Sequence, residues 1–299
     1  MDNNKTCIVF GANGYLGRHL VYFLKNANIN VEAFDIQDKF ESFEIDYLKL
    51  DISNIESLKN INWNVDYIFM FAGITGTYNG FDNYNEYVVV NEIGLLNILD
   101  KIRKSNFRPR IVFPSSRLVY KGSNISLKED DRKEAKTIYG INKIACENIL
   151  EVYRNSFDIP YTIYRICVPY GNNLGADYSY GTVGFFLNQA KNIGTINLYG
   201  DGSLRRTFTN VEDICNQLIP SCLNEKSSNQ VYNTIGEEYS LKEIAMMVAN
   251  KYNAKLTFSE WPDKDFRIES GHTVFNSQKI KNDFNFELKN SIKKWLVQI

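Results

Sequence analysis

The chain has 299 residues, of which 44% are hydrophobic and 23% are charged, the composition of an ordinary globular protein. A net charge of −1 gives no general attraction to nucleic acid or to an anionic membrane surface. No run approaches the roughly 18 consecutive apolar residues of a membrane span, and the polar residues 1–6 do not resemble a signal peptide, so we expect a cytoplasmic protein.

Cysteine and histidine residues are few and scattered. The five cysteines include no C-x-x-C pair, which predicts buried, reduced side chains in a reducing compartment. The two histidines are His19 and His272, which disfavours both a zinc site and a histidine-dependent triad. We therefore expect no metal, and the chemistry must come from other residue types.

Short β-rich runs alternate with amphipathic helical segments through the first two-thirds of the chain. This pattern predicts an α/β fold, a Rossmann-type doubly wound parallel sheet with crossover helices. The predicted strands cover residues 7–10, 31–35, 47–51, 67–71, 110–114 and 161–168, and the predicted helices include residues 16–26, 87–104 and 139–155. From about Tyr170 the pattern loosens and glycine and asparagine become frequent. We therefore predict a main domain over residues 1–169 and a smaller C-terminal substrate-binding lobe over residues 170–299, with some of the chain returning to the main domain.

A glycine turn follows the first predicted strand and opens a helix. Gly11 permits the tight turn, Gly14 lets the backbone approach a pyrophosphate, and Gly17 lets the helix pack close to the sheet. The N–H groups at the start of the helix can then bind phosphate. The spacing G-x-x-G-x-x-G is one residue longer in its first gap than the common dinucleotide fingerprint, so the strand and helix around it carry part of the prediction.

Asp35 ends the second predicted strand, eighteen residues after Gly17. A carboxylate there accepts hydrogen bonds from the ribose 2′-hydroxyl of NAD and repels the 2′-phosphate of NADP, which predicts NAD as the cofactor. Asp51 and Ile52 could reach the adenine, and the small residues after the fourth strand let the cofactor lie against the sheet edge. The predicted cofactor-binding residues from these segments are Gly11, Asn13, Gly14, Tyr15, Leu16, Asp35, Asp51, Ile52, Phe71, Ala72 and Gly73.

Tyr139 and Lys143 are four residues apart and therefore share one face of a predicted helix. An ammonium group beside a phenol lowers the pKa of the phenol, so Tyr139 could act as a general acid or base near neutral pH. Of the nineteen tyrosines, Tyr139 alone has a lysine four residues later, although a surface pair is the alternative. Ser116 follows the fifth strand, where α/β sheets bind ligands, and could hydrogen-bond the substrate oxygen during hydride transfer; Ser115 is the weaker candidate.

Together these residues resemble the extended short-chain dehydrogenases, the NAD-dependent nucleotide-sugar epimerase/dehydratase family, over nearly the whole chain. The residues that carry the resemblance are Gly11, Gly14, Gly17, Asp35, Ala72, Gly73, Ser116, Tyr139 and Lys143. The resemblance implies that Ser116, Tyr139 and Lys143 are catalytic and that Tyr139 and Lys143 also contact the cofactor. It further implies that Asn91 supports the active-site geometry beside the cofactor.

Residues 200–213 are similar to the family's substrate-lobe motif, in which an arginine before an aromatic residue holds the nucleotide diphosphate. Arg206 matches that arginine, and a guanidinium suits bidentate contact with phosphate. Arg267 is a second candidate with a weaker match, and a surface charge is the alternative for both. The resemblance thus implies a nucleotide-diphosphate sugar that binds between the lobes, with its diphosphate on Arg206.

Two departures from the family pattern bear on the reaction. Dehydratases carry Asp-Glu directly after the hydroxyl residue, whereas this chain has Arg117 and Leu118, which disfavours a 4,6-dehydratase. Arg117 could contact the substrate or form a surface ion pair. Residues 164–171 resemble the segment R-x-x-N-x-x-G, but Val168 replaces the asparagine that usually contacts the substrate phosphate, as in some 4-keto-sugar reductases. This replacement weakens an assignment as a UDP-hexose 4-epimerase.

The predicted function is that of an NAD-dependent oxidoreductase or epimerase acting at the 4-position of a nucleotide-diphosphate sugar through a 4-keto species. One alternative is an NADH-dependent nucleotide 4-keto-6-deoxy-sugar 4-reductase. A non-catalytic NAD(H)-binding regulator is a second alternative, disfavoured because both Tyr139 and Lys143 are present. The resemblance also implies a homodimer formed through the helices predicted over residues 87–104 and 139–155, whose apolar faces could otherwise only cover the sheet.

Overall fold

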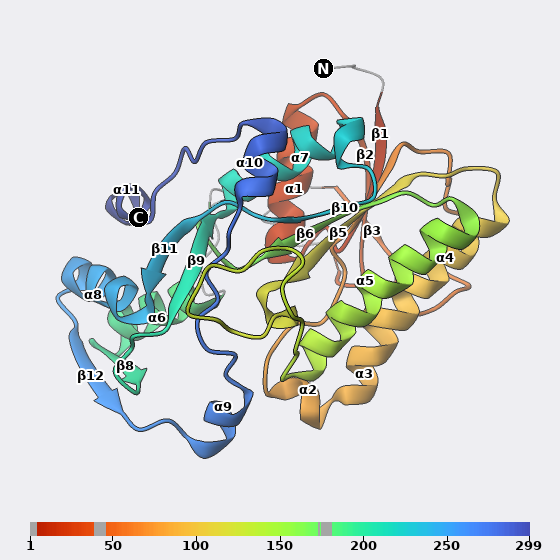
Figure 1. Cartoon of the computed structure of the whole chain (residues 1–299). Coiled ribbons are helices and arrows are strands. Elements are labelled where there is room, and N and C mark those ends of the chain that lie inside the picture. The colour runs from red at the N-terminus through yellow and green to blue at the C-terminus, as the bar shows by residue number, and fades with distance from the viewer. Residues whose placement is uncertain (1–4, 39–45, 173, 175–180) are drawn as a thin grey trace. The chain divides into compact units, whose positions relative to one another are not determined.

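The chain forms two compact units in the computed structural model, which describes residues 5–38, 46–172, 174 and 181–299 (Figure 1). Unit 1 contains residues 1–119, 137–165 and 218–232, and unit 2 contains residues 120–136, 166–217 and 233–299. Two segments depart from a simple division at Tyr170. Residues 120–136 belong to unit 2, and residues 218–232 return to unit 1, where they supply an edge strand of its sheet.

A seven-stranded sheet forms the centre of unit 1. Its strands are β1 (Thr6–Phe10), β2 (Asn30–Asp35), β3 (Leu48–Lys49), β4 (Tyr67–Met70), β5 (Arg110–Ser116), β6 (Tyr161–Ile166) and β10 (Gln230–Asn233). They lie in the order β10-β6-β5-β4-β1-β2-β3, and the pairs from β3 to β5 are parallel. The order reverses between β1 and β4, the switch point at which such sheets bind ligands. The predicted doubly wound α/β fold is confirmed.

Helices cover both faces of this sheet. The helical segments of unit 1 are α1 (Tyr15–Asn26), α2 (Asn79–Asp82), α3 (Tyr84–Val88), η1 (Val89–Ile93), α4 (Gly94–Lys104), η2 (Arg117–Val119), α5 (Ile138–Phe157) and η3 (Glu225–Ser227). Helix α1 lies on one face, and α4 and α5 run side by side on the other (Figure 1). This arrangement explains why the central strands are apolar on both sides.

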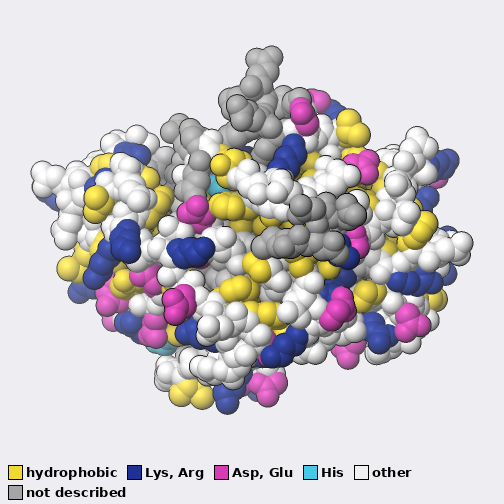
Figure 2. All heavy atoms as spheres, turned by 90° about the horizontal axis from the view of Figure 1, so that it is seen from above, with side chains coloured by type: hydrophobic (Ala, Val, Ile, Leu, Met, Phe, Trp, Pro, Cys, Tyr) yellow, Lys and Arg dark blue, Asp and Glu magenta, His cyan; other side chains and the backbone are white. Residues whose placement is uncertain are grey.

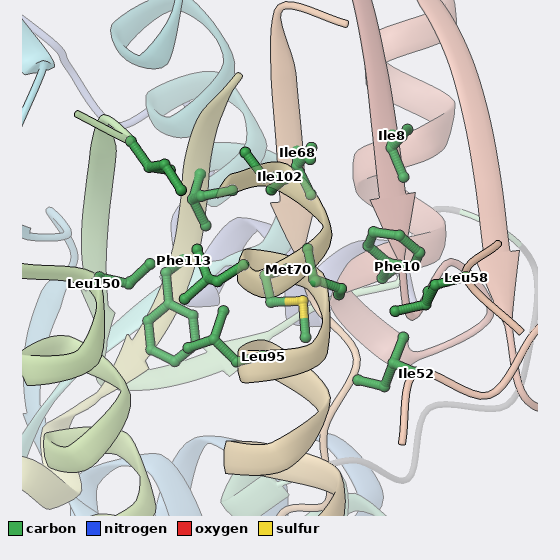
Figure 3. Close-up of a cluster of buried hydrophobic side chains, with 14 of the residues drawn as sticks. Ile8, Phe10, Ile52, Leu58, Ile68, Met70, Leu95, Ile102, Phe113 and Leu150 are labelled. Atoms are coloured by element: carbon green, nitrogen blue, oxygen red, sulfur yellow. The ribbon is translucent and has the colours of Figure 1, made fainter. Parts of the chain in front are cut away.

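Alternate residues of neighbouring strands form the core under α4 and α5. Ile8 and Phe10 of β1 lie beside Ile68 and Met70 of β4, and Leu95 of α4 lies next to Phe113 of β5 in the same cluster (Figure 3). Side chains alternate between the faces of a strand, so the intervening residues point toward α1. Each fully buried side chain of this kind stabilises the fold by roughly 1.5–3 kcal/mol. The core therefore fixes β5 and α5, the two elements that carry the predicted catalytic residues.

Three predicted elements differ from those observed. The strand predicted over residues 161–168 ends at Ile166, and β7 (Val168–Tyr170) joins another sheet in unit 2. The helix predicted over residues 87–104 is interrupted by η1, a single π-helical turn. The strand predicted over residues 47–51 is shorter, because the Asp51 carboxylate accepts hydrogen bonds from the backbone N–H and hydroxyl of Ser53 and starts a turn.

Unit 2 contains two smaller sheets. Its further strands are β8 (Thr195–Tyr199), β9 (Arg205–Asn210), β11 (Glu237–Ser240) and β12 (Lys255–Ser259). Strand β9 lies between β7 and β11, and β8 pairs with β12. The helices are α6 (Gly181–Asn192), α7 (Val211–Cys222), α8 (Leu241–Tyr252), α9 (Asp263–Ile268), α10 (Gln278–Phe284) and α11 (Ile292–Gln298), and the end of α7 returns to unit 1.

Charged side chains lie on the surface, and the cysteines lie in the interior. Basic and acidic side chains are interspersed on the face shown in Figure 2. All five cysteines lie in the described residues, are buried and are reduced thiols. Across the described parts of the chain, no helix is both long enough and apolar enough to cross a membrane.

Candidate active site

Two glycines at the turn between β1 and α1 have no space for a side chain. Gly11 has a φ of +83°, and a Cβ at this position would lie 2.3 Å from the backbone nitrogen of Ala72. A Cβ on Gly17 would lie 1.9 Å from the carbonyl oxygen of Gly11. Gly14 begins α1 without a side-chain cap, and the first turn of the helix carries no acidic residue. This helix N-terminus therefore suits a pyrophosphate.

Asp35 lies at the end of β2, beside the same turn. Its carboxylate accepts hydrogen bonds from the backbone N–H of Asn13 at 2.9 Å and of Gln37 at 3.0 Å. The Asn13 side chain donates to Gln37 Oε1 at 2.9 Å, which further fixes the turn. An acceptor held at this strand end suits a ribose hydroxyl. The residues present therefore fit NAD: Asn13, Gly14, Tyr15 and Leu16 would hold its pyrophosphate and Asp35 its ribose.

Asn91 lies in the π-helical turn η1 and holds the segment that follows β4. Its Oδ1 accepts from the backbone N–H of Ile74 at 2.8 Å, and its Nδ2 donates to the Ile74 carbonyl at 3.0 Å. A Cβ on Gly73 would lie 2.9 Å from Asn91 Oδ1, so the absent side chain gives the amide room. Single π-helical turns frequently occur at functional sites. Asn91 thus fixes the backbone next to the predicted cofactor contacts Phe71, Ala72 and Gly73.

The two predicted adenine contacts, Asp51 and Ile52, have structural partners of their own. Asp51 accepts the two hydrogen bonds from Ser53 described above and is partly exposed. Ile52 is buried in the core, where a Cβ on Gly94 would lie 2.6 Å from its Cδ1. Their contact with the adenine stays a prediction.

Tyr139 and Lys143 lie one turn apart near the start of α5. Thr137 caps this helix by accepting from the backbone N–H of Gly140 at 3.0 Å. Lys143 Nζ is 5.6 Å from the centre of the Tyr139 ring and donates to the carbonyl oxygen of Pro114 at 2.7 Å. Lys143 is buried, and this burial lowers its pKa to about 8, whereas Tyr139 is partly exposed. Tyr139 and Lys143 therefore lie close together, and the hydrogen bond from Lys143 to Pro114 connects this pair to β5.

Ser116 is the last residue of β5, two positions after Pro114. It is buried, and its Oγ accepts from the backbone N–H of Leu118 at 3.2 Å. Arg117 and Leu118 follow in the 3₁₀ turn η2, where Arg117 is partly exposed and Leu118 is buried. Because Lys143 binds the carbonyl of Pro114, Ser116 and the Tyr139–Lys143 pair belong to one region of unit 1.

A network of polar side chains that the sequence did not predict joins η1, α5 and β5 in this part of unit 1. Asn142 Nδ2 donates to Glu92, and Asn91 Nδ2 donates to Asn142 Oδ1 at 3.3 Å. One turn further along α5, Glu147 accepts hydrogen bonds from Ser115 and Arg165. The available signal was the spacing of Tyr139, Lys143 and Glu147, which places a carboxylate one turn after the lysine on the same helix face.

Arg206 lies in β9 of unit 2, and only 2% of it is exposed. Its Nη2 donates to Glu269 Oε1 at 2.8 Å. Its Nη1 donates to the carbonyl of Gly271 at 2.8 Å and to Thr273 Oγ1 at 3.2 Å. The side chain is thus held by a carboxylate within its own unit. Its role toward a diphosphate stays a prediction, one that requires a phosphate to replace Glu269.

The neighbouring arginines of unit 2 are more exposed. Arg267 in α9 pairs with Asp263 at 2.7 Å, and both side chains are exposed. Arg205 pairs with Glu238 at 2.5 Å and with Glu243 at 3.3 Å. Exposed pairs of this kind contribute little to stability, so Arg267 is available to a ligand at small energetic cost.

The fold and the Tyr139–Lys143 pair together define a class of protein. A tyrosine and a lysine attached to the strand ends of a dinucleotide-binding sheet are typical of short-chain dehydrogenases. The model of the NAD dependent epimerase/dehydratase family matches residues 7–234, which is well over half of the chain. The chain therefore belongs to this family, whose cofactor is NAD.

Individual relatives of the chain include different activities. It is 27% identical over 246 residues to a putative UDP-glucose 4-epimerase of Methanocaldococcus jannaschii, with 79% of each chain covered. It is 23% identical over 269 residues to dTDP-4-dehydro-6-deoxyglucose reductase of Escherichia coli, with 85% and 84% covered. The structure of Thermus thermophilus UDP-glucose 4-epimerase in complex with NAD matches with a TM-score of 0.85 at 19% identity, covering 97% and 96% of the chains.

Proposed function

We propose that this protein is an NAD-dependent enzyme that acts at the 4-position of a nucleotide-diphosphate sugar, most simply as a 4-epimerase. The observation that carries the proposal is the placement of Lys143. Its Nζ lies beside the Tyr139 ring and donates to the Pro114 carbonyl at the end of β5, next to Ser116. One region of unit 1 thus combines a phenol, an ammonium and a hydroxyl, the groups needed to move a proton at an alcohol or ketone oxygen.

Each of the three residues has a distinct role in this proposal. Tyr139 takes the proton of the sugar 4-hydroxyl and returns it to the 4-keto oxygen. Lys143 in its charged form favours the phenolate of Tyr139 and holds the nicotinamide ribose. Ser116 hydrogen-bonds the reacting oxygen. When NAD is bound, it would accept the hydride from the 4-carbon of the sugar, and its reduced form would donate it back.

A 4-ketoreductase is the second candidate function. The similarity to the E. coli reductase and the presence of Val168 support it. A 4,6-dehydratase is disfavoured, because Leu118 is apolar and buried and Arg117 cannot serve as a proton donor at neutral pH. In either candidate function Arg206 would bind the diphosphate, while Arg117 and Arg267 are further candidate substrate contacts.

We also propose a cytoplasmic homodimer. Side chains exposed on the outer surfaces of η1 and α5 include Ile93 at 40%, Ile141 at 52% and Val152 at 57%. Isolated exposed apolar residues are common, but burial of these three against a second copy would be favourable. Light scattering at micromolar concentration should give twice the mass of the chain, and the mass of one chain would contradict the proposal.

The experiment that separates the two candidate functions follows NADH absorbance with purified protein and a panel of nucleotide 4-keto-6-deoxy sugars. Stoichiometric loss of NADH would identify a 4-ketoreductase and overturn the epimerase assignment. An epimerase should instead consume no NADH, carry bound NAD after purification and invert ordinary nucleotide hexoses. Bound dinucleotide without turnover of either panel would support a non-catalytic NAD(H)-binding regulator.

A further inference from the structure

The buried face of α5 continues from Tyr139 and Lys143 to Glu147, one further turn along the helix. Glu147 is 4% exposed, and Arg165 on β6 is 1% exposed. Arg165 Nε donates to Glu147 Oε1 at 2.9 Å, and Arg165 Nη2 donates to Oε2 at 2.7 Å. These two parallel bonds fix both the position and the plane of the carboxylate.

The same carboxylate holds β5. Ser115 Oγ donates to Glu147 Oε1 at 2.6 Å, and the preceding residue, Pro114, accepts from Lys143 Nζ at 2.7 Å. Two successive residues of β5 are therefore attached to two successive turns of α5. Ser116 comes next in the strand, so its position relative to α5 depends on both attachments.

We propose that Glu147 and Arg165 are positioning residues, which hold Ser116 at its working distance from Tyr139 and Lys143 through Ser115. This proposal rests on the catalytic roles proposed above for those three residues. A buried ion pair is a poor device for stability alone, because a well-packed apolar pair of similar size is often as stable. By contrast, a carboxylate that accepts hydrogen bonds from two different strands fixes both strands relative to the helix that carries it.

The charge of Glu147 has a second effect on the site. Burial is the largest influence on Lys143 and lowers its pKa, while nearby Cys146 and Glu147 oppose that shift. The Glu147 carboxylate therefore helps to keep the lysine charged at neutral pH. Arg165 supplies the counter-charge of this buried carboxylate through the two hydrogen bonds given above.

Ser115→Ala tests the proposal without disturbing the ion pair, since it removes only the link between Glu147 and β5. We expect kcat to fall about 10-fold or more, because small displacements of reacting groups have effects of this size, while KM and NAD binding stay within about twofold. Ser115→Thr, which keeps a hydroxyl, should recover most of the loss. The matched control is Ser227→Ala, which removes an equally buried hydroxyl that contacts Arg110 elsewhere in unit 1, and it should keep full activity.

Hydrogen–deuterium exchange provides a measurement that does not need turnover. In Ser115→Ala, peptides covering residues 113–119 should exchange faster than in the wild type, while those of α5 stay unchanged. Wild-type kcat and unchanged exchange in Ser115→Ala would overturn the positioning role. A wild-type protein that turns over neither sugar panel would instead overturn the proposed function, and the exchange data would then still decide whether Glu147 holds β5.

Discussion

Two buried cations, one in each unit, have different hydrogen-bond partners. In unit 1, Lys143 is buried with a backbone carbonyl as its acceptor at 2.7 Å, and burial lowers its pKa to about 8. In unit 2, Arg206 is equally buried but is neutralised by Glu269 at 2.8 Å. A lysine can lose its proton when it is desolvated, whereas an arginine stays charged and needs a counter-ion. Lys143 is therefore a titratable group, whereas Arg206 is a permanent charge with a carboxylate partner.

This difference matches the separate tasks of the proposed reaction. Proton movement needs a group whose charge can change near neutral pH, and Lys143 on α5 in unit 1 is such a group. Binding of a diphosphate needs a cation that is charged at every pH, and the candidate for this lies on β9 in unit 2. Variants in unit 1 should therefore act mainly on kcat, and variants around Arg206 mainly on KM.

The largest effect should come from removing the Tyr139 hydroxyl. Tyr139→Phe should lower kcat by at least ~100-fold, the low end for loss of a general acid–base, with normal NAD binding. Stopped turnover assays measure kcat, and a dinucleotide titration measures the binding of NAD. Tyr153→Phe, which removes a hydroxyl further along α5, is the matched control. Near-normal turnover of Tyr139→Phe would contradict the assignment of unit 1 as the catalytic region.

The dependence of kcat on pH should reflect the lowered pKa of Lys143. The side chain is charged below about pH 8 in the folded protein, so kcat should fall as pH rises through about 8. A lysine in the unfolded chain has a pKa of about 10.4. Between pH 8 and this value the unfolded state binds more protons than the folded state, so the contribution of Lys143 to the free energy of unfolding rises with pH. Lys143→Arg cannot lose its charge in this range and should lack the alkaline fall. A wild-type profile that is flat from pH 7 to 10 would argue against a titrating Lys143.

The smallest effect should come from the counter-ion of Arg206. Glu269→Gln keeps a hydrogen-bond acceptor but removes the charge that competes with a phosphate. We expect KM for the nucleotide sugar to fall about threefold or more, with kcat unchanged. Glu238→Gln, which removes a carboxylate from the exposed Arg205 pair, is the control and should leave KM as it is. An unchanged KM in Glu269→Gln would mean that the Arg206 pair only stabilises unit 2.

The sequence by itself determined the fold class, the glycine turn and the spacing of Tyr139 and Lys143 on one helix face. These features follow from short-range patterns: strand and helix periods, glycines that follow a strand, and a tyrosine and lysine one helical turn apart. Ser116 followed from its place at the carboxyl end of the fifth predicted strand. The family resemblance added Asn91 and Arg206, because each occurs in a motif that can be recognised without knowing its partners in space.

Only the tertiary structure decided which groups hold these residues. Glu147, Arg165 and Ser115 lie on α5, β6 and β5, and no local pattern predicts that three separate elements converge on one carboxylate. The pairing of Arg206 with Glu269 and the burial of Lys143 likewise depend on long-range packing. Desolvation and ion pairing are properties of the folded environment, so the charge state and availability of a side chain cannot be predicted from its neighbours in sequence alone.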